Sequence, residues 1–314
     1  MIAENDLLEI CNYLIEIVKD AGNIIVTTRP TSLTLTTKKN SMYIPKLLSL
    51  HAANRYSAAD IVTQTDQAVE DFIRARLTKR YPTFAFVGEE SYKAGVAISD
   101  QPTFIVDPVD GTSNFVHAFP AVCISIGFVI EKKPTIGVVY NPFREELWSA
   151  VKGHGAFTQQ SGGDKQKLPL VSAPLRGLGP ACIGIEWGSD REGPNFELNL
   201  EVFTALARTP ATGGRFVNSL RCTGSAAITI CRIAAGQQDA FWECGCWAWD
   251  VAAAWCILIE AGGIMVDGHP GEWNPPLDNR RYLAVRPATE GQREFVGDFW
   301  SVIGDKRSTY GPPN

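Results

Sequence analysis

The sequence predicts a layered α/β protein, and three observations support that prediction. Apolar residues recur at helical spacing near the N-terminus, short apolar runs follow in the middle, and strand-like and helix-like segments alternate in the second half. Such alternation is typical of helices packed in layers against sheets. The chain has 314 residues, of which 45% are hydrophobic, so its length permits one large domain or two small ones.

The first half is expected to open with two helices and to continue as strands. Helical spacing predicts a helix over residues 6–27, with Asp6 as its N-cap, and a second from Asp66 to Tyr81, which Pro82 ends. The polar run 131–134 predicts a hairpin connection. Strands are expected at 84–87, 103–106, 123–130, 136–140 and 147–151.

The second half is expected to alternate strand and helix. Strands are predicted at 182–186, 216–220, 239–242 and 282–285, and helices at about 195–208, 225–236, 249–262 and from about 289. No internal repeat or linker is apparent in the sequence. The residues after Asp305, 306–314, are predicted to form a flexible tail.

Composition excludes several classes of function. The net charge is −5, which argues against a nucleic-acid partner. Eight cysteines, mostly in apolar segments, indicate reduced buried thiols, and Cys244-Gly245-Cys246 alone is a weak metal signal. The acidic N-terminus shows no signal peptide, and the apolar run 121–130 is too short to span a bilayer. We therefore expect a soluble cytoplasmic protein with no membrane partner.

The segment Asp107 to Phe115, DPVDGTSNF, carries the strongest chemical signal. Two carboxylates lie three residues apart directly after an apolar run, and Pro108 between them favours a turn. Gly111 permits close approach of the backbone, and Thr112 or Ser113 could cap a following helix. Such a turn can present oxygen ligands to a divalent cation beside a helix N-terminus that binds phosphate.

Acidic residues occur in turn-like contexts in four segments: 60–66, 88–90, 107–110 and 249–250. Each alone is equally typical of a helix cap or a solvated turn. Together they are expected to meet beyond the carboxyl ends of strands, where converging carboxylates need a cation. Because no paired His or Cys ligands accompany them, Mg²⁺ or Mn²⁺ suits the site, and metal-assisted phosphate ester hydrolysis is the chemistry that follows.

Residues 41–57 do not fit the surrounding pattern. Without 42–57, the loop containing Lys38 and Lys39 would run directly into the acidic segment 60–66. Codons for Ser-Met-Tyr at 41–43 can contain a splice-donor sequence. We hypothesise that 42–57 is a retained intron or else a genuine loop insertion. A transcript that carries these codons in every read would exclude the intron.

Two motifs, DPVDGTSNFVHAFP (107–120) and WDVAAAWCILIEAGG (249–263), closely resemble the signatures of the inositol monophosphatase family. GEES (88–91) and DIVTQTD (60–66) match its other metal-site segments, and the likeness extends to about residue 287. The resemblance implies a single domain over 1–305 with the αβαβα layered sandwich that is inositol monophosphatase/fructose bisphosphatase-like. It also implies a homodimer, two to three Mg²⁺ per site, and a small phosphate monoester as substrate.

The resemblance also assigns roles to individual residues. One metal would be bound by Glu89, Asp107 and the Val109 carbonyl. A second, weaker metal, at the site where lithium inhibits, would be bound by Asp107, Asp110 and Asp250. A third would be held by Glu89 through waters. Thr112, paired with Asp66, would activate the nucleophilic water, and the backbone N–H groups of Gly111 and Thr112 would hold phosphate. Near the catalytic metal, the family's Lys corresponds to Lys38 or Lys39 without the insertion, whereas Arg55 stands there with it.

Substrate choice rests on fewer residues. Glu243 matches the family's Glu that accepts hydrogen bonds from inositol hydroxyls, and Gly224, Ser225 and Ala226 match the helix start that contacts the ring. A solvated strand-end Glu and a plain helix cap remain alternatives for these positions. Trp247 replaces a position that is commonly His. The tryptophans at 242, 247, 249 and 255 could stack on a cyclic substrate, although a core or dimer-interface role is more typical.

The residues together favour a Mg²⁺-dependent phosphomonoesterase that hydrolyses myo-inositol monophosphate. One alternative is a related phosphatase acting on another small polyol or cyclitol phosphate, because the segment 186–191 and the GCWAWD pattern resemble a fungal branch that includes the quinate-cluster phosphatase. Another is a catalytically impaired regulatory homologue, which the insertion favours and the intact ligand set opposes.

Overall fold

The structure, a computed structural model, describes residues 2–28, 58–93 and 95–311. The inserted segment 42–57, which contains Arg55, and the preceding Lys38 and Lys39 lie outside these ranges, so the predictions about them are not tested. Within these ranges, no helix combines the length and the apolar character that crossing a membrane requires.

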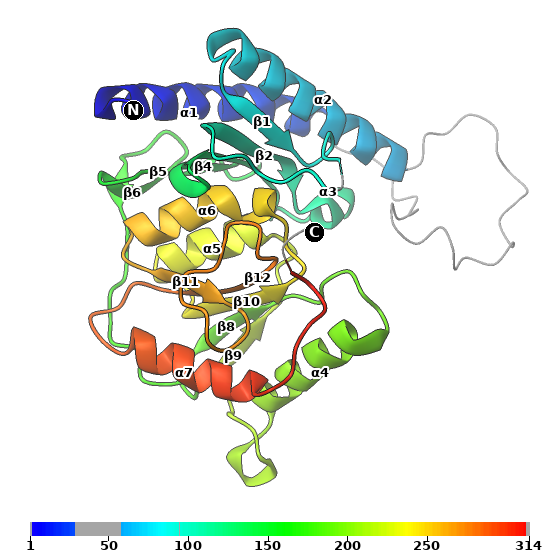
Figure 1. The fold of residues 1–314 in the computed structure, drawn as a ribbon, viewed down its shortest axis with the longest axis vertical. Helices are drawn as coiled ribbons and strands as arrows, with labels where there is room; N and C mark the ends of the chain where they lie inside the picture. The colour runs from blue at the N-terminus through cyan, green and yellow to red at the C-terminus, as the bar shows by residue number, and fades with distance from the viewer. Residues whose placement is uncertain (1, 29–57, 94, 312–314) are drawn as a thin grey trace, which may run out of the picture.

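Five layers of secondary structure stack along the long axis of the molecule (Figure 1). Helices α1 (Glu4–Thr27) and α2 (Ala58–Arg80) cover one face of a seven-stranded sheet, and α5 (Ala226–Ala234) and α6 (Ala248–Glu260) lie between that sheet and a five-stranded one. On the outer face of the second sheet lie α4 (Gly193–Ala207) and α7 (Gln292–Ile303). The predicted αβαβα sandwich is therefore confirmed, whereas the assignment of 1–305 to a single domain stays a prediction.

The seven-stranded sheet runs in chain order, with β1 and β2 parallel and the other neighbours antiparallel. Its strands are β1 (Ala85–Gly88), β2 (Thr103–Asp110), β3 (Cys123–Ile130), β4 (Lys133–Asn141), β5 (Glu146–Val151), β6 (Gly155–Gln160) and β7 (Gln166–Lys167). Strands β6 and β7 are additional to the prediction. The predicted hairpin is confirmed as a tight turn at Glu131 and Lys132, whose φ angles are 51° and 60°.

The five-stranded sheet has the order β11-β12-β10-β8-β9, with β8 parallel to both its neighbours. Its strands are β8 (Cys182–Ile185), β9 (Ser219–Arg221), β10 (Ala240–Cys244), β11 (Ile264–Asp267) and β12 (Arg281–Val285), and a short 3₁₀ helix, η1 (Pro210–Thr212), follows α4. The sequence pattern missed β11 and placed β9 about three residues early.

Three predicted helix starts were wrong. Helix α1 begins after Ala3, and Asp6 lies inside it with its carboxylate accepting from the Ala3 N–H at 3.1 Å. Helix α2 begins at Ala58, so Asp66 is an interior helical residue and the acidic segment 60–66 is not a strand. Helix α3 (Thr112–Val116) has Gly111 as its N-cap in the left-handed region, so neither Thr112 nor Ser113 caps it.

Helix α6 lies directly against two glycines of the first sheet. Gly127 and Gly137 are cross-strand partners in β3 and β4. A Cβ added at Gly137 would lie 2.0 Å from the Ala253 carbonyl oxygen, and one at Gly127 would lie 2.8 Å from the Ala252 Cβ. Only glycine therefore fits beneath the alanine-rich face of α6. This contact sets the height of the helix above the sheet.

Residues 308–310 near the chain end make hydrogen bonds to distant parts of the fold, whereas the flexibility of 306–314 stays a prediction. The Ser308 N–H donates to Nε2 of His269 at 3.0 Å, and the Thr309 N–H donates to Oδ1 of Asn195 at 2.7 Å. The Tyr310 carbonyl accepts from Arg281 at 2.5 Å. The sequence pattern missed these contacts because each joins residues that lie far apart in the chain.

We predict that Gly137→Ala lowers the free energy of unfolding by about 1–3 kcal/mol, because the added methyl group overlaps the α6 backbone. Urea denaturation measures the change. The control is Gly297→Ala on α7, where a Cβ meets nothing within 4 Å and Ala is the better helix former, so stability should rise by up to about 1 kcal/mol. Equal stabilities for Gly137→Ala and the wild type would contradict the packing described above.

We predict that His269 makes stability depend on pH. Burial, followed by the charge of Arg281, lowers the pKa of His269 from 6.5 to about 4, so the unfolded chain binds this proton more tightly than the folded one. The stabilisation is therefore complete above pH 6.5 and is lost as the pH falls toward 4. Urea midpoints of the wild type and His269→Gln, measured at pH 7.5 and 5, should show the larger loss in the wild type. Parallel pH profiles would exclude this role.

Candidate active site

Carboxylates from distant segments gather at one end of the first sheet. Glu89 follows β1, Asp107 and Asp110 belong to the parallel neighbour β2, and Asp250 lies in the first turn of α6. The pKa of Asp107 lies well above its ordinary value because of burial and, in decreasing order, the charges of Glu89, Asp110, Asp250 and Asp66. The structure thus brings together the acids that the sequence predicted to meet.

Burial, with a further contribution from nearby negative charges, also raises the pKa of the neighbouring acids Asp250 and Asp110. Burial, followed by the charges of Glu89 and Asp110, raises the pKa of Asp250 to about 8. Burial raises the pKa of Asp110 to about 6, although hydrogen bonds from Ser225 and Ala227 oppose the shift. Acids that hold their protons near neutral pH lack a compensating positive charge, and a divalent cation supplies one.

The donor set fits a hard divalent cation by its chemistry, since it consists of carboxylate oxygens and the Val109 carbonyl. Among residues 2–28, 58–93 and 95–311, however, no three His, Cys, Asp or Glu side chains already stand close enough together to hold a metal ion. Binding a cation here therefore requires the carboxylates to turn toward it. The assignment of individual ligands remains a prediction.

Three donors fix one oxygen of Asp110. Its Oδ2 accepts from the Ser225 hydroxyl at 2.6 Å, from the Ala227 N–H at 2.9 Å and from the Cys123 thiol at 3.6 Å. The Ser225 hydroxyl also caps α5 by accepting from the Ile228 N–H at 3.2 Å. Ser225, predicted to contact substrate, therefore anchors Asp110 to the start of α5.

Backbone geometry around Asp110 follows from an irregularity in β2. The register with β3 shifts between Asp107 and Asp110, so both carboxylates leave the strand near the same end. The Val109 N–H donates to Oδ1 of Asp107 at 3.0 Å, and the Val109 carbonyl accepts from the Thr112 hydroxyl at 3.1 Å. Pairing of Thr112 with Asp66 stays a prediction, and Asp66 is 2% exposed.

The turn at Thr223 and Gly224 lies against the first motif. Asn114 donates through Nδ2 to the carbonyls of Ala121 and Thr223, both at 2.8 Å. A Cβ at Gly111 would lie 2.5 Å from the Ala121 oxygen and 3.4 Å from the Gly224 oxygen. Gly111, whose φ is 89°, is therefore required here, and it brings the predicted phosphate-binding and ring-binding backbones side by side.

Glu186 is a site residue that the sequence pattern did not identify. It directly follows β8, and its Oε1 accepts from the N–H groups of Thr223 at 2.7 Å and Gly224 at 2.8 Å. The available signal was the same one that identified the other acids, an acidic residue at the carboxyl end of a strand. Glu186 holds the turn that precedes α5 and Ser225.

Glu243 is the penultimate residue of β10, and Trp247 is the N-cap of α6. Burial, followed by the charge of Glu186, raises the pKa of Glu243 well above its ordinary value. The backbone N–H of Trp247 donates to Oδ2 of Asp250 at 2.7 Å. The indole ring of Trp247 stacks on that of Trp249, with ring centroids 5.1 Å apart. The predicted group of four tryptophans does not stay together. Trp247 and Trp249 lie beside Asp250, Trp242 is fully buried in the core beneath α7, and Trp255 packs edge-on against Tyr282 with centroids 5.9 Å apart.

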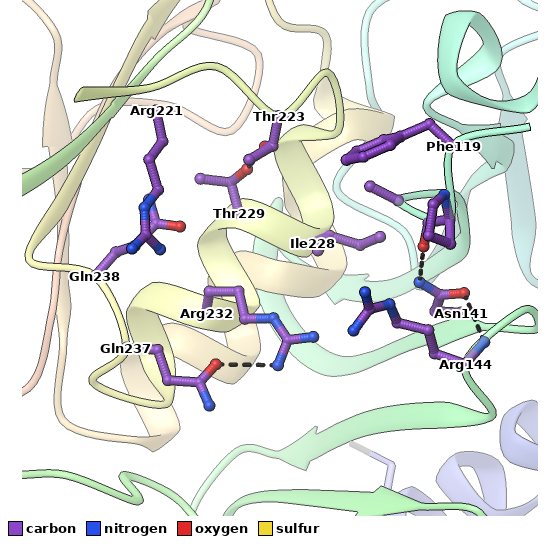
Figure 2. Close-up of a pocket in the computed structure, with 12 residues that line it drawn as sticks. Phe119, Asn141, Arg144, Arg221, Thr223, Ile228, Thr229, Arg232, Gln237 and Gln238 are labelled. Carbon is purple, nitrogen blue, oxygen red and sulfur yellow. Dashed lines mark hydrogen bonds between the residues drawn. The ribbon is translucent and has the colours of Figure 1, made fainter. Parts of the chain in front are cut away.

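A groove of about 400 Å³ has none of the four gathered carboxylates, Glu89, Asp107, Asp110 and Asp250, in its lining (Figure 2). It shares Ala121 and Thr223 with the turn described above, and Arg144, Arg221 and Arg232 line it. Arg232 is held by Glu146 and Gln237. In the part of the chain that is described, Arg144 and Arg221 form no ion pair, so the groove presents positive charge to solvent.

Comparison with known proteins identifies the family. The model of the inositol monophosphatase family matches residues 6–303. Inositol monophosphatase 2 of Saccharomyces cerevisiae is 45% identical over 83% of this chain and 90% of its own length, and quinic acid degradation cluster protein x of Neurospora crassa is 35% identical over 95% and 94%.

The fold comparison agrees with the sequence matches. A solved structure of the extragenic suppressor protein suhB of Bartonella henselae has a TM-score of 0.71 at 26% identity, covering 95% of this chain and 100% of that one. The family match spans both carboxylate motifs, and the structure brings these motifs together. The chain therefore belongs to the inositol monophosphatase family of metal-dependent phosphatases.

Proposed function

We propose that the protein hydrolyses myo-inositol monophosphate to inositol and phosphate with Mg²⁺ as cofactor. The observation that carries the proposal is the group of acids around Asp107: Glu89, Asp110, Asp250 and Asp66 lie close enough that their charges, after burial, raise the Asp107 pKa. Two to three Mg²⁺ ions would balance this charge, neutralise the phosphate oxygens and activate a water as nucleophile. Their proposed ligands are Glu89, Asp107, Asp110, Asp250 and the Val109 carbonyl.

The chain's own groups are proposed to position the reactants. Thr112 and Asp66 orient the attacking water and accept its proton, with Glu89 assisting. Backbone N–H groups of Gly111 and Thr112 hold the phosphate.

The cyclitol ring is proposed to lie between two anchored walls. Gly224, Ser225 and Ala226 form one, which the 2.6 Å hydrogen bond from Ser225 to Asp110 ties to the metal ligands. Glu243 on the other accepts hydrogen bonds from ring hydroxyls, for which an acceptor-only carboxylate is suited.

Three further properties are proposed on the strength of family membership. The enzyme would be inhibited by lithium at the weaker metal, would form a homodimer and would act in the cytoplasm. The exposed Phe119, with 54% of its surface accessible at the rim of the arginine groove, is compatible with an interface. Light scattering coupled to size-exclusion chromatography measures the oligomeric state.

A second candidate substrate is a cyclitol phosphate that carries another anionic group. The arginine groove favours it, because Arg144 and Arg221 line the same groove as Thr223, which belongs to the turn proposed to bind the ring. Similarity to the quinic acid cluster protein of Neurospora crassa adds support, since a carboxylated cyclitol has this chemistry.

We predict that Asp110→Asn lowers kcat/KM for inositol monophosphate by at least about 100-fold while the fold persists. The donors of Ser225 and Ala227 occupy Oδ2, so the amide oxygen must face them and the amide NH₂ faces the metal. Phosphate release with Mg²⁺ measures the rate, and circular dichroism checks the fold. Wild-type rates in this variant would refute the metal assignment. No turnover by the wild type on any sugar or cyclitol phosphate would defeat the enzyme proposal.

We predict that Arg221→Gln separates the two substrate candidates. If the physiological substrate carries a second anion, the KM for phosphorylated carboxylated cyclitols should rise about 10–100-fold, because a charge-assisted hydrogen bond is lost. The KM for inositol monophosphate should stay within about twofold. Arg208→Gln, a remote surface change near the end of α4, controls for net charge. No selective effect of Arg221→Gln would exclude the second candidate.

A further inference from the structure

The segment after α7 runs from the outer helical layer along the side of the molecule toward α3 (Figure 1). Ser308 is 8% exposed, and its N–H is held by His269. Asn195 of α4 bonds both the N–H and the hydroxyl of Thr309, at 2.7 and 2.8 Å. These contacts hold Tyr310 in a defined position, where it contacts Asp190 on one side and the segment around Gly245 on the other.

Tyr310 reaches the first wall through Asp190. Its hydroxyl donates to Oδ2 of Asp190 at 2.8 Å, and the Asn195 amide donates to the same oxygen at 2.7 Å. Asp190 belongs to the loop that begins at Glu186. The Glu186 carboxylate holds the N–H groups of the turn before α5, so the loop that Tyr310 anchors is the loop that shapes this turn.

Tyr310 reaches the second wall through Arg280. The Arg280 guanidinium carbon lies 4.9 Å from the centroid of the Tyr310 ring and 3.6 Å from that of Trp247, so the cation lies between two aromatic faces. Arg280 also donates to the Gly245 carbonyl at 2.8 Å. A Cβ at Gly245 would lie 3.2 Å from the Tyr310 ring, so the ring rests on the segment that joins Glu243 to Trp247.

We propose that Tyr310 is a positioning residue that holds both walls of the substrate site in register. It contacts none of the proposed metal ligands in the described structure, and its partners lead to the ring-binding turn on one side and to Glu243 on the other. Its loss therefore weakens recognition of the cyclitol ring and leaves the chemical step intact. The role in recognition rests on the proposed function, whereas the bracing of the two segments does not.

Tyr310→Ala in the full-length chain tests the proposal. With Mg²⁺ and inositol monophosphate, KM should rise about tenfold while kcat stays within about twofold, the pattern for lost binding that is equal in ground and transition states. Discrimination between inositol monophosphate and glycerol 2-phosphate, which lacks the ring, should fall by a similar factor. An unchanged KM, or a fall in kcat at constant KM, would overturn the role in recognition.

Two further variants separate the parts of the contact. Tyr310→Phe keeps the ring against Arg280 and loses the bond to Asp190, so its KM should lie between those of the wild type and Tyr310→Ala. The control is Lys306→Ala, in the same C-terminal segment as Tyr310. It removes an ion pair with Glu201 of α4 and should leave KM unchanged. An equal rise in KM for Lys306→Ala would show that the segment matters only as a whole and would contradict the specific role of Tyr310.

Hydrogen exchange provides a test that does not depend on the substrate. Peptides covering 186–191 and 243–250 should exchange faster in Tyr310→Ala than in the wild type, and those covering β3 and β4 should not. If the wild type hydrolyses no inositol monophosphate, the proposed function fails and this measurement still decides whether Tyr310 braces the two segments. Unchanged exchange in both peptides would refute the bracing itself. Should Tyr310→Ala fail to fold, Tyr310→Phe carries both measurements.

Discussion

The close approach of α6 to the first sheet is the contact on which the candidate site depends. Gly127 and Gly137 remove the side chains that would hold the helix away, and Ala252 and Ala253 fill the space. Asp250 lies in the first turn of the same helix, so the height of α6 above the sheet sets the distance between Asp250 and the carboxylates of β2. A packing requirement deep in the core therefore has a direct consequence for the chemistry at the edge.

Charge imposes the second constraint. Burying several acids together costs free energy unless protons or cations neutralise them, and the raised pKa of Asp107 and Asp250 records that cost. The fold tolerates the arrangement because backbone and hydroxyl donors already satisfy part of the carboxylates of Asp107, Asp110 and Asp250. What remains is a demand for positive charge, which a divalent cation meets. The buried negative charge that costs free energy of folding is thus the same charge that allows the site to bind a cation.

Much of the fold and of the site could be predicted because the relevant signals are local. The spacing of apolar residues located most strands and helices. The acidic residues at strand ends predicted where the carboxylates gather. The failures have physical causes. Short strands such as β7 and β11 take their register from their neighbours, Asp66 resembles a helix cap although α2 begins earlier, and the chain end is held by partners such as His269 and Asn195 that are distant in sequence.

The sequence by itself determined the reaction class, because Asp107, Asp110 and Gly111 combine ligand chemistry with a turn that few other residues allow. Tertiary structure decided how the remaining parts meet. Only the folded chain brings Glu186 to the turn before α5, and only it brings Tyr310 between Arg280 and Asp190. The difference follows from the range of the interactions: a motif carries its own backbone geometry, whereas contacts between distant segments depend on the packing of all the layers between them.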